Sequence, residues 1–324
     1  MSVPGRAFLL VLLALSFSGC RGSPPASPPV RLRVLSVNIA GLPLGLSRDL
    51  EARVRRLEER LPSFEADVVL LQEVWTRQLA ERLRRRFEPE YVATWSPREK
   101  DDLLSLEAVD RELDRRLGEG GAASKPFLLS AYRNMMMGAP RGGLVILSRT
   151  APAAVAFTPF PRRPDLTFEE ALGSKGLLVA VLPTAAGDVA LADTHLVAPM
   201  FRLREGRIEP FDPEVRREQL DILHGELDRR RGLAVVLGGD LNLRRAAPEG
   251  GEGEYGSFLR RGFADAFDGA EDGARPDVDY VLVRSSSRTR VAVDGARMVL
   301  TRPEERVSDW HPGVLAELSL GRAD

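Results

Sequence analysis

Cysteine is almost absent from the chain, because Cys20 is the only one in 324 residues. A single cysteine excludes an intramolecular disulfide and a zinc site built from cysteines. Net charge is nearly absent as well, since 46 Lys and Arg residues against 47 Asp and Glu residues leave -1 at pH 7. No overall field therefore draws the protein to nucleic acid or to anionic lipid, and only local charged patches remain open to such partners.

The N-terminus lacks an apolar run long enough to cross a membrane. Residues 7–17 form an apolar stretch that follows Arg6 and ends in Ser18 and Gly19, and it is too short to span a bilayer. A basic residue, a short apolar stretch and small residues are typical of a secretory signal peptide. We therefore interpret residues 1–20 as a targeting segment that is not part of the fold.

The lone cysteine closes this segment. Residues 17–20, Phe-Ser-Gly-Cys, resemble a bacterial lipobox, in which the cysteine becomes the lipid-modified first residue of the mature protein. Phe17 departs from the leucine that is usual there. The Pro- and Ser-rich residues 21–30 then suit a tether. This predicts lipidation of Cys20 and an extracytoplasmic protein anchored to a bacterial membrane. The alternative is an ordinary signal peptide with an incidental cysteine and a secreted product.

The rest of the composition is that of a folded domain. Apolar residues make up 44% and charged residues 29%, which is ordinary for a soluble chain with a sizeable core. We expect one domain over residues 31–324, with no internal repeat. Residues 96–126 interrupt its regular pattern, because a charged helical stretch there is followed by the glycine-rich residues 118–121 and by no motif. We interpret them as an insertion near the functional site.

Apolar strands alternate with amphipathic helices along the domain, which predicts an α/β fold. The strand pattern falls on residues 31–37, 67–75, 141–149, 176–182, 188–193, 235–242, 277–283 and 314–318. Capping residues followed by leucines at helical spacing predict helices that begin at Ser47, Thr76 and Asp212, and Pro62 ends the first of them.

Polar side chains recur where these strands end. They are Asn38, Glu73, His195, Asp240, Asn242, Asp279, Asp309 and His311. Asp240 and Asn242 share one face because residues two apart in an extended chain point the same way, and the glycines before them allow a close approach of backbone. Carboxylates with asparagine suit Mg²⁺ or Mn²⁺, and two histidines suit proton transfer during attack on a phosphodiester.

Structural alternatives exist for several of these residues. Gly-Gly-Asp with Asn two positions on also occurs as plain turn chemistry, and Glu73 could be only the solvent end of a strand. Lys175, before a strand, is equally a turn residue or a functional one. His224 lies on the apolar stripe of a helix, which favours a packed or surface histidine over a catalytic one. The run 135–137 of three methionines favours buried packing over a membrane-touching loop.

Taken in order, these residues resemble the endonuclease/exonuclease/phosphatase superfamily across nearly the whole mature chain. Several stretches are further similar to neutral sphingomyelinases, namely Asn38-Ile39-Ala40-Gly41-Leu42-Pro43, Gln72-Glu73-Val74-Trp75, Ser174-Lys175-Gly176, Thr194-His195-Leu196 and Arg217-Glu218-Gln219-Leu220. The resemblance implies a four-layer α/β/β/α sandwich, in which two packed mixed β-sheets are flanked by helices and the site lies at one edge.

The resemblance also implies a role for each site residue. Glu73 would bind an essential Mg²⁺ (or Mn²⁺) with Asn38 close by, and Asp309 would be a second metal-facing group. The catalytic group would comprise Asp240 and Asn242, which orient the phosphate and the attacking water, His311 as general base, Asp279 as the partner of its imidazole, and His195 as a contact to the phosphate.

One departure from the superfamily pattern lies at its last motif. Aspartate is usually followed directly by histidine, whereas here Trp310 stands between Asp309 and His311. In an extended strand this change would turn the histidine to the face of the aspartate, so a bulge or loop must restore its aim. In addition, residues 284–307 contain no aromatic residue where some secreted sphingomyelinases carry a membrane-binding aromatic hairpin, which disfavours lipid binding by that route.

The predicted function is therefore a Mg²⁺-dependent phosphodiesterase, most like a sphingomyelinase, that releases a phospholipid head group by attack of water. An extracytoplasmic nuclease of the same superfamily is the first alternative, and a basic groove would favour it because phosphate contacts dominate nucleic-acid affinity. The altered spacing at Trp310 motivates the second alternative, a catalytically dead binding lipoprotein.

Overall fold

The computed structural model describes residues 29–41, 49–117, 125–161, 170, 173–198, 201–204, 207–210, 213–245, 253–268 and 275–323. The predicted signal peptide, Cys20, most of the tether and the proposed helix cap Ser47 lie outside these residues. Lipidation therefore stays a prediction. Within the described ranges, no helix is both long enough and apolar enough to cross a membrane.

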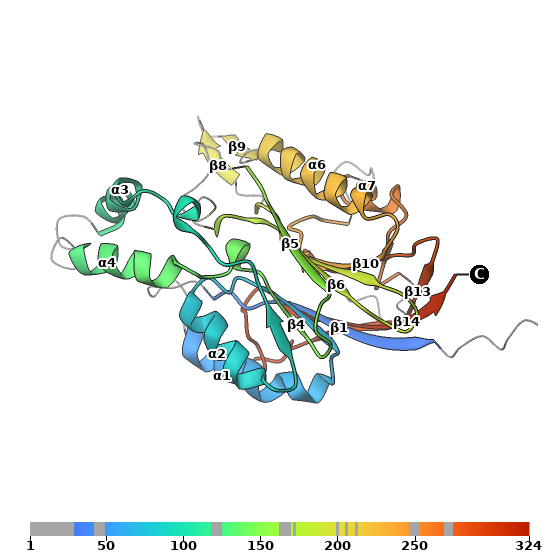
Figure 1. Cartoon of the computed structure of the whole chain (residues 1–324). Helices are drawn as coiled ribbons and strands as arrows, with labels where there is room; N and C mark the ends of the chain where they lie inside the picture. Colours follow the sequence, from blue (N-terminus) through green and yellow to red (C-terminus); the bar gives the residue numbers. More distant parts are fainter. Residues whose placement is uncertain are drawn as a thin grey trace, which may run out of the picture.

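Two six-stranded sheets form the centre of the domain (Figure 1). The first has the order β13-β14-β1-β2-β4-β3 and consists of β1 (Val30–Asn38), β2 (Val68–Gln72), β3 (Val92–Thr94), β4 (Val145–Ser148), β13 (Thr289–Val299) and β14 (Gly313–Arg322). The second has the order β11-β12-β10-β7-β6-β5 and consists of β5 (Ala154–Pro159), β6 (Gly176–Leu182), β7 (Val189–His195), β10 (Ala234–Asp240), β11 (Ala264–Asp265) and β12 (Asp279–Arg284). A separate small hairpin pairs β8 (Phe201–Arg204) with β9 (Arg207–Pro210).

Helices cover the outer face of each sheet, as Figure 1 shows. On the first sheet lie α1 (Leu50–Arg60) and α2 (Arg77–Phe87), and on the second lie α6 (Pro213–Arg229) and α7 (Gly256–Leu259). A pair of helices, α3 (Leu106–Leu117) and α4 (Lys125–Met136), projects from one end. The four-layer α/β/β/α sandwich expected from the sequence is confirmed.

Alternation along the strands explains the layering. In β1, Val34 joins the core between the two sheets, whereas Leu35 and Val37 pack beneath α1 and α2. In β10, Val236 enters the same inter-sheet core, and Val235 and Leu237 pack against α6. Strands that are buried on both faces read as continuous apolar runs, which is why the sequence located them well.

The sequence placed some boundaries wrongly. The strand expected over 141–149 begins only at Val145, because Arg141–Gly143 forms a 3₁₀ turn whose Gly142 and Gly143 have positive φ. No strand was expected over 289–299, yet β13 runs there at the edge of the first sheet with a register shift between Val293 and Gly295. An exposed edge strand lacks the apolar run that marks a central one.

The insertion expected over residues 96–126 stays a prediction, and a helix lies across its expected end. This helix, α4, runs to Met136 and packs against α3 through Val109 and Tyr132. Met136 is buried as expected, whereas Met137 is 37% exposed. Arg141 joins this region to the main body, because its Nε donates to Asp102 Oδ2 at 2.7 Å.

Candidate active site

Strand register brings the predicted residues to one edge of the sandwich. Asp240 lies opposite His195 in the parallel β10–β7 pair and opposite Asp279 in the antiparallel β10–β12 pair. In the other sheet, Asn38 lies opposite Gln72 in the parallel β1–β2 pair, which puts Asn38 next to Glu73. Both sheets therefore deliver polar side chains at the same edge.

Gly238 and Gly239 allow this convergence. Gly239 has φ +148, and a Cβ there would lie 2.0 Å from the Thr194 carbonyl oxygen of the neighbouring strand. A Cβ on Gly238 would lie 2.4 Å from Leu70 Cδ1 in the opposite sheet. Neither position accepts a side chain, so the paired glycines hold β10 close to both neighbours just before Asp240.

The centre of the site is a group of oxygen atoms around Asn38. Its Nδ2 donates to Glu73 Oε1 at 2.9 Å and to Asp240 Oδ2 at 3.0 Å, while its Oδ1 accepts from Ala40 N at 2.9 Å. Trp75 Nε1 donates to the other Glu73 oxygen at 3.2 Å. Asn38 thus orients both carboxylates through its amide NH₂, and its role as a direct metal ligand stays a prediction.

Residues with left-handed backbone cluster at this edge. Ala40, Glu73, Ser174 and Asn242 have φ between 46° and 62°, and each lies at or beside a predicted site residue. Such conformations cost roughly 1–3 kcal/mol each in non-glycine residues and persist where surrounding structure enforces them, often at functional sites. Among the described residues Asp49, Glu65 and Leu300 also have positive φ, so the strain accompanies the site but is not confined to it.

His311 reaches the site in spite of the extra residue before it. Residues 309–312 form a loop and β14 begins only at Gly313, so no strand periodicity fixes the aim of the ring. His311 Nδ1 donates to Asp279 Oδ2 at 3.0 Å, and its Nε2 lies 3.7 Å from Asp240 Oδ2. A loop, and not a strand, therefore sets the aim of His311, and its role as general base stays a prediction.

The charges at the site are strongly coupled. Burial and the charge of Asp279 raise the pKa of Asp240 to about 7. Burial alone would lower the pKa of His311, but the hydrogen bond and charge of Asp279 outweigh it, with help from Asp240 and Glu73, and raise that pKa to about 9. Without a bound cation, His311 is therefore protonated at neutral pH and offsets part of the negative charge.

His195 behaves differently. Its side chain is buried, its Nε2 lies 3.4 Å from Asp240 Oδ2, and its Nδ1 has no hydrogen-bond partner among the described residues. Burial, together with the charges of Lys175 and His311, lowers the pKa of His195 well below 6.5. A neutral imidazole of this kind can donate one hydrogen bond to a phosphate but carries no charge.

The other two predicted residues lie toward the rim. Asn242 is half-buried, its Nδ2 donates to Leu196 O at 3.0 Å, and its backbone N–H donates to Asp240 Oδ1 at 3.0 Å. Asp309 is exposed and lies outside both clusters of potential metal ligands in the described part of the chain. Its metal-facing role stays a prediction.

Several supporting residues lie outside the predicted site, and for Lys175 the sequence fits a turn residue and a functional residue equally well. Lys175 is buried and its Nζ donates to Leu196 O at 3.0 Å and to Glu170 Oε1 at 2.9 Å, so it braces the segment after His195. Arg216 Nη2 donates to Val197 O at 3.0 Å, and its Nη1 donates to Asn242 O at 2.5 Å. The sequence feature that could have indicated Arg216 is its position among the buried residues of α6.

A buried polar pair lies behind the site, between the sheets. Gln72 Nε2 donates to Asp193 Oδ1 at 2.7 Å, and both side chains are fully buried. Burial raises the pKa of the Asp193 carboxyl well above 3.8. The sequence of β7, an apolar strand that contains Asp193, does not indicate that this aspartate pairs with Gln72 of the other sheet.

The donor set suits a hard divalent cation. Glu73, His195 and Asp240 each offer a ligand atom within 4.8 Å of the others, and so do Asp240, Asp279 and His311. Carboxylates dominate this set, which fits Mg²⁺ or Mn²⁺ better than a thiophilic ion. Burial, and then the charge of Asp279, raise the pKa of Asp240, and a cation bound there would favour its charged form.

The sequence matches the model of the Endonuclease/Exonuclease/phosphatase family over residues 35–309. Because the match covers most of the chain, the protein belongs to this family, whose members are hydrolases of phosphoester bonds. The match ends at Asp309, one residue before the inserted Trp310. No curated protein matches the sequence closely enough to count as a relative.

Solved structures share the fold at low identity. Sphingomyelinase C from Streptomyces griseocarneus has TM-score 0.57 and 21% identity over 92% of this chain and 100% of its own. Humanized D. rerio TDP2 has TM-score 0.58 and 18% identity over 89% and 98%. The human Nocturnin catalytic domain has TM-score 0.58 and 17% identity over 90% and 94%. These likenesses establish the fold and leave the substrate open.

Proposed function

We propose that the protein is a Mg²⁺-dependent phosphodiesterase that releases a phosphorylated head group from a phospholipid. The observation that carries this proposal is the Asp279–His311 pair, 3.0 Å apart, held beside Asp240 and Glu73 at one edge of the sandwich. A histidine whose tautomer is fixed by a carboxylate, next to further carboxylates that can hold a cation, suits the attack of water on phosphorus.

Each side chain has a distinct task in this proposal. Glu73 and Asp240 would hold the cation, which when bound polarises a phosphoryl oxygen and lowers the pKa of neighbouring groups. Asp279 accepts from Nδ1 of His311, so Nε2 is the atom that faces the site and exchanges a proton with the attacking water. His195 donates a hydrogen bond to the phosphate as a neutral imidazole. The amide of Asn242 is hydrogen-bonded to Leu196 O, directly after His195.

Two features of the sequence and one prediction from it favour a lipid over a nucleic-acid substrate. The stretches around Asn38, Glu73 and Lys175 resemble neutral sphingomyelinases. The chain has a net charge of -1, whereas non-specific nucleic-acid binding relies on cationic surfaces. Anchoring through Cys20, as proposed from the sequence, would keep the enzyme at a membrane outside the cytoplasm.

The test measures phosphocholine release from sphingomyelin vesicles and nicking of plasmid DNA, each with Mg²⁺ and with chelator. We expect lipid hydrolysis that requires Mg²⁺ and falls at least about 100-fold in His311→Ala. Val155→Ala, at a 48% exposed position on β5, is the matched control and should keep wild-type activity. Nicking of DNA without lipid hydrolysis would contradict the lipid proposal and favour a nuclease. Silence on both substrates would favour a binding lipoprotein.

A further inference from the structure

Trp310 is the most exposed large hydrophobic side chain of the described residues. Its side chain is 85% exposed, whereas the next, Val155, is 48% exposed and Trp75 is buried at 5%. Tryptophan ordinarily covers 150–250 Å² of surface when buried, roughly the largest apolar contribution of any residue. An indole left in water beside a catalytic histidine therefore suggests a contact that forms only with a ligand.

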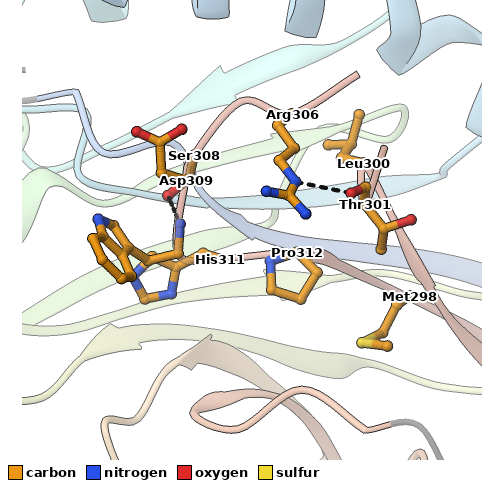
Figure 2. Close-up of a pocket in the computed structure, with 9 residues that line it drawn as sticks. Met298, Leu300, Thr301, Arg306, Ser308, Asp309, His311 and Pro312 are labelled. Atoms are coloured by element: carbon orange, nitrogen blue, oxygen red, sulfur yellow. Dashed lines mark hydrogen bonds between the residues drawn. The ribbon is translucent and has the colours of Figure 1, made fainter. Parts of the chain in front are cut away.

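The loop presents Trp310 to the reaction site. Its backbone N–H donates to Oγ of the buried Ser308 at 3.3 Å, which fixes the turn before His311. Trp310 and His311 line the same pocket, of about 230 Å³, and Met298, Leu300 and Pro312 form its apolar side (Figure 2). A substituent on a phosphorus atom bound at His311 can enter this pocket and meet the indole.

The charges around the pocket select among substituents. Asp309 lines it with an exposed carboxylate that has no hydrogen bond or ion pair within the described part of the chain. Burial lowers the pKa of Arg53, and the charge of Asp309 acts in the opposite direction. The Arg53 guanidinium donates its hydrogen bonds to the carbonyls of Ile39, Ala40 and Val307. Arg306 also lines the pocket and keeps its positive charge, but its Nε donates to Thr301 O at 2.8 Å, which holds the guanidinium beside Leu300 and Thr301 (Figure 2).

An aromatic face, a carboxylate and apolar walls together form the recognition pattern of a quaternary ammonium group. The indole attracts the cation through its π-electrons, the carboxylate supplies opposite charge, and Met298, Leu300 and Pro312 suit the N-methyl groups. A primary ammonium would lose more hydration on entering such a pocket, and a neutral group would gain nothing from the charge.

We propose that Trp310, with Asp309, binds the quaternary ammonium of a choline head group on the substrate phosphate and so determines specificity. This inference rests on the proposed phosphodiesterase function. It gives the extra residue at position 310 a task that a direct Asp-His sequence could not perform.

The test compares two soluble phosphodiesters of the same shape. One is p-nitrophenyl phosphorylcholine, and the other is p-nitrophenyl 3,3-dimethylbutyl phosphate, in which carbon replaces the charged nitrogen. We expect wild type to show about 10-fold higher kcat/KM on the choline ester, and Trp310→Leu to reduce this ratio to about 2 or less. Trp310→Phe should retain part of the preference, and the control Val155→Ala should retain all of it.

The outcomes separate this inference from the proposed function. Hydrolysis of both esters at equal rates by wild type would overturn the head-group proposal and leave the phosphodiesterase intact. Hydrolysis of neither ester would overturn both. An equal loss on both esters in Trp310→Leu would show that the indole only shapes the site. A selective loss on the p-nitrophenyl ester of thymidine 5′-phosphate would make it a base-stacking residue instead.

Binding can also be followed without turnover. Phosphocholine should change the tryptophan fluorescence of wild type at concentrations where inorganic phosphate does not, because the exposed indole contacts the ammonium. Trp310→Phe should remove most of that change, and whatever remains is the signal of Trp75, which donates to Glu73, and of the half-buried Trp95. An unchanged response in Trp310→Phe would contradict the contact even if the variant's kinetics were altered.

Discussion

The inner wall of the site and its rim differ in how they are held. The wall consists of Asn38, His195, Asp240 and Asp279, all at most 5% exposed and fixed by strand register. The rim is the loop over residues 300–312, where Asp309 and Trp310 are exposed and the contacts that hold them are few. We infer that the wall, together with His311, carries the proposed chemistry and that the exposed Asp309 and Trp310 of the rim carry the choice of substrate.

Arg53 connects the two regions. It is a buried arginine on α1 whose guanidinium donates to the carbonyls of Ile39 and Ala40, just after β1, and to that of Val307 on the rim. One side chain therefore sets the distance between the end of a wall strand and the base of the rim loop. Substitutions in the wall, at this connection and far from both should have graded effects on hydrolysis.

The largest effect is expected from Asp279→Asn. The amide cannot hold the imidazole in the same tautomer and charge state, so kcat should fall on the order of 10³–10⁴-fold. The variant also removes the hydrogen bond and charge of Asp279 that help to raise the pKa of His311 to about 9, so that pKa should fall. An NMR titration of His311 in the metal-free protein measures this shift. A His311 pKa that stays near 9 would contradict the account.

Asp240→Asn should lower kcat about 100- to 1000-fold, because it removes one charged group from the centre of the wall. The same change should leave the fold at least as stable, since burial and Asp279 make the Asp240 charge costly and raise its pKa to about 7. Urea unfolding at pH 8 without metal measures the second effect. A strongly destabilised Asp240→Asn protein would show that this carboxylate is structural.

Arg53→Lys should have an intermediate effect. Lysine cannot reach three carbonyls as the guanidinium does, so we expect kcat/KM to fall about 10-fold and stability to fall by about 2 kcal/mol. Arg56→Lys is the matched control, because the Nε of the half-buried Arg56 donates to only one carbonyl, that of Arg306, at 2.8 Å. Equal losses in the two variants would show that Arg53 has no special place between wall and rim.

The smallest effect on hydrolysis is expected from His224→Gln. His224 is buried on α6 and contacts Ser257 Oγ at 2.7 Å, far from the wall in the fold. Burial and the charge of Arg261 lower the pKa of His224 to about 4. The stability that neutral His224 provides is present above pH 6.5 and is lost as pH falls toward 4. Urea midpoints between pH 7 and pH 4.5 should fall less in His224→Gln than in wild type, and parallel curves would contradict the assignment.

The wall could be predicted from the sequence because its residues follow apolar runs. Asp240 after Val235–Gly239, and Glu73 after Val68–Gln72, mark strand ends that meet at one edge in an α/β sandwich. The expected packing of His224 was confirmed for the same reason, since its neighbours on α6 follow helical spacing.

The rim and the supports of the wall could not be predicted. The aim of His311 depends on a loop whose conformation no periodicity specifies, and β13 is an edge strand without an apolar run. Arg53 and Asp193 act through partners that are distant in sequence, Val307 and Gln72. Such partners become visible only when the sheets and loops are in place.

The most direct test of the central claim is the Mg²⁺ dependence of bis(p-nitrophenyl) phosphate hydrolysis by wild type and by Glu73→Gln. The neutral amide keeps the shape of Glu73 but removes the negative charge that, with Asp240, would hold the cation. The account predicts saturable activation of wild type by Mg²⁺, loss of activity with chelator, and a loss of at least about 100-fold in Glu73→Gln. Hydrolysis that persists in chelator, or that is the same in both proteins, would contradict a metal-dependent site at this edge of the sandwich.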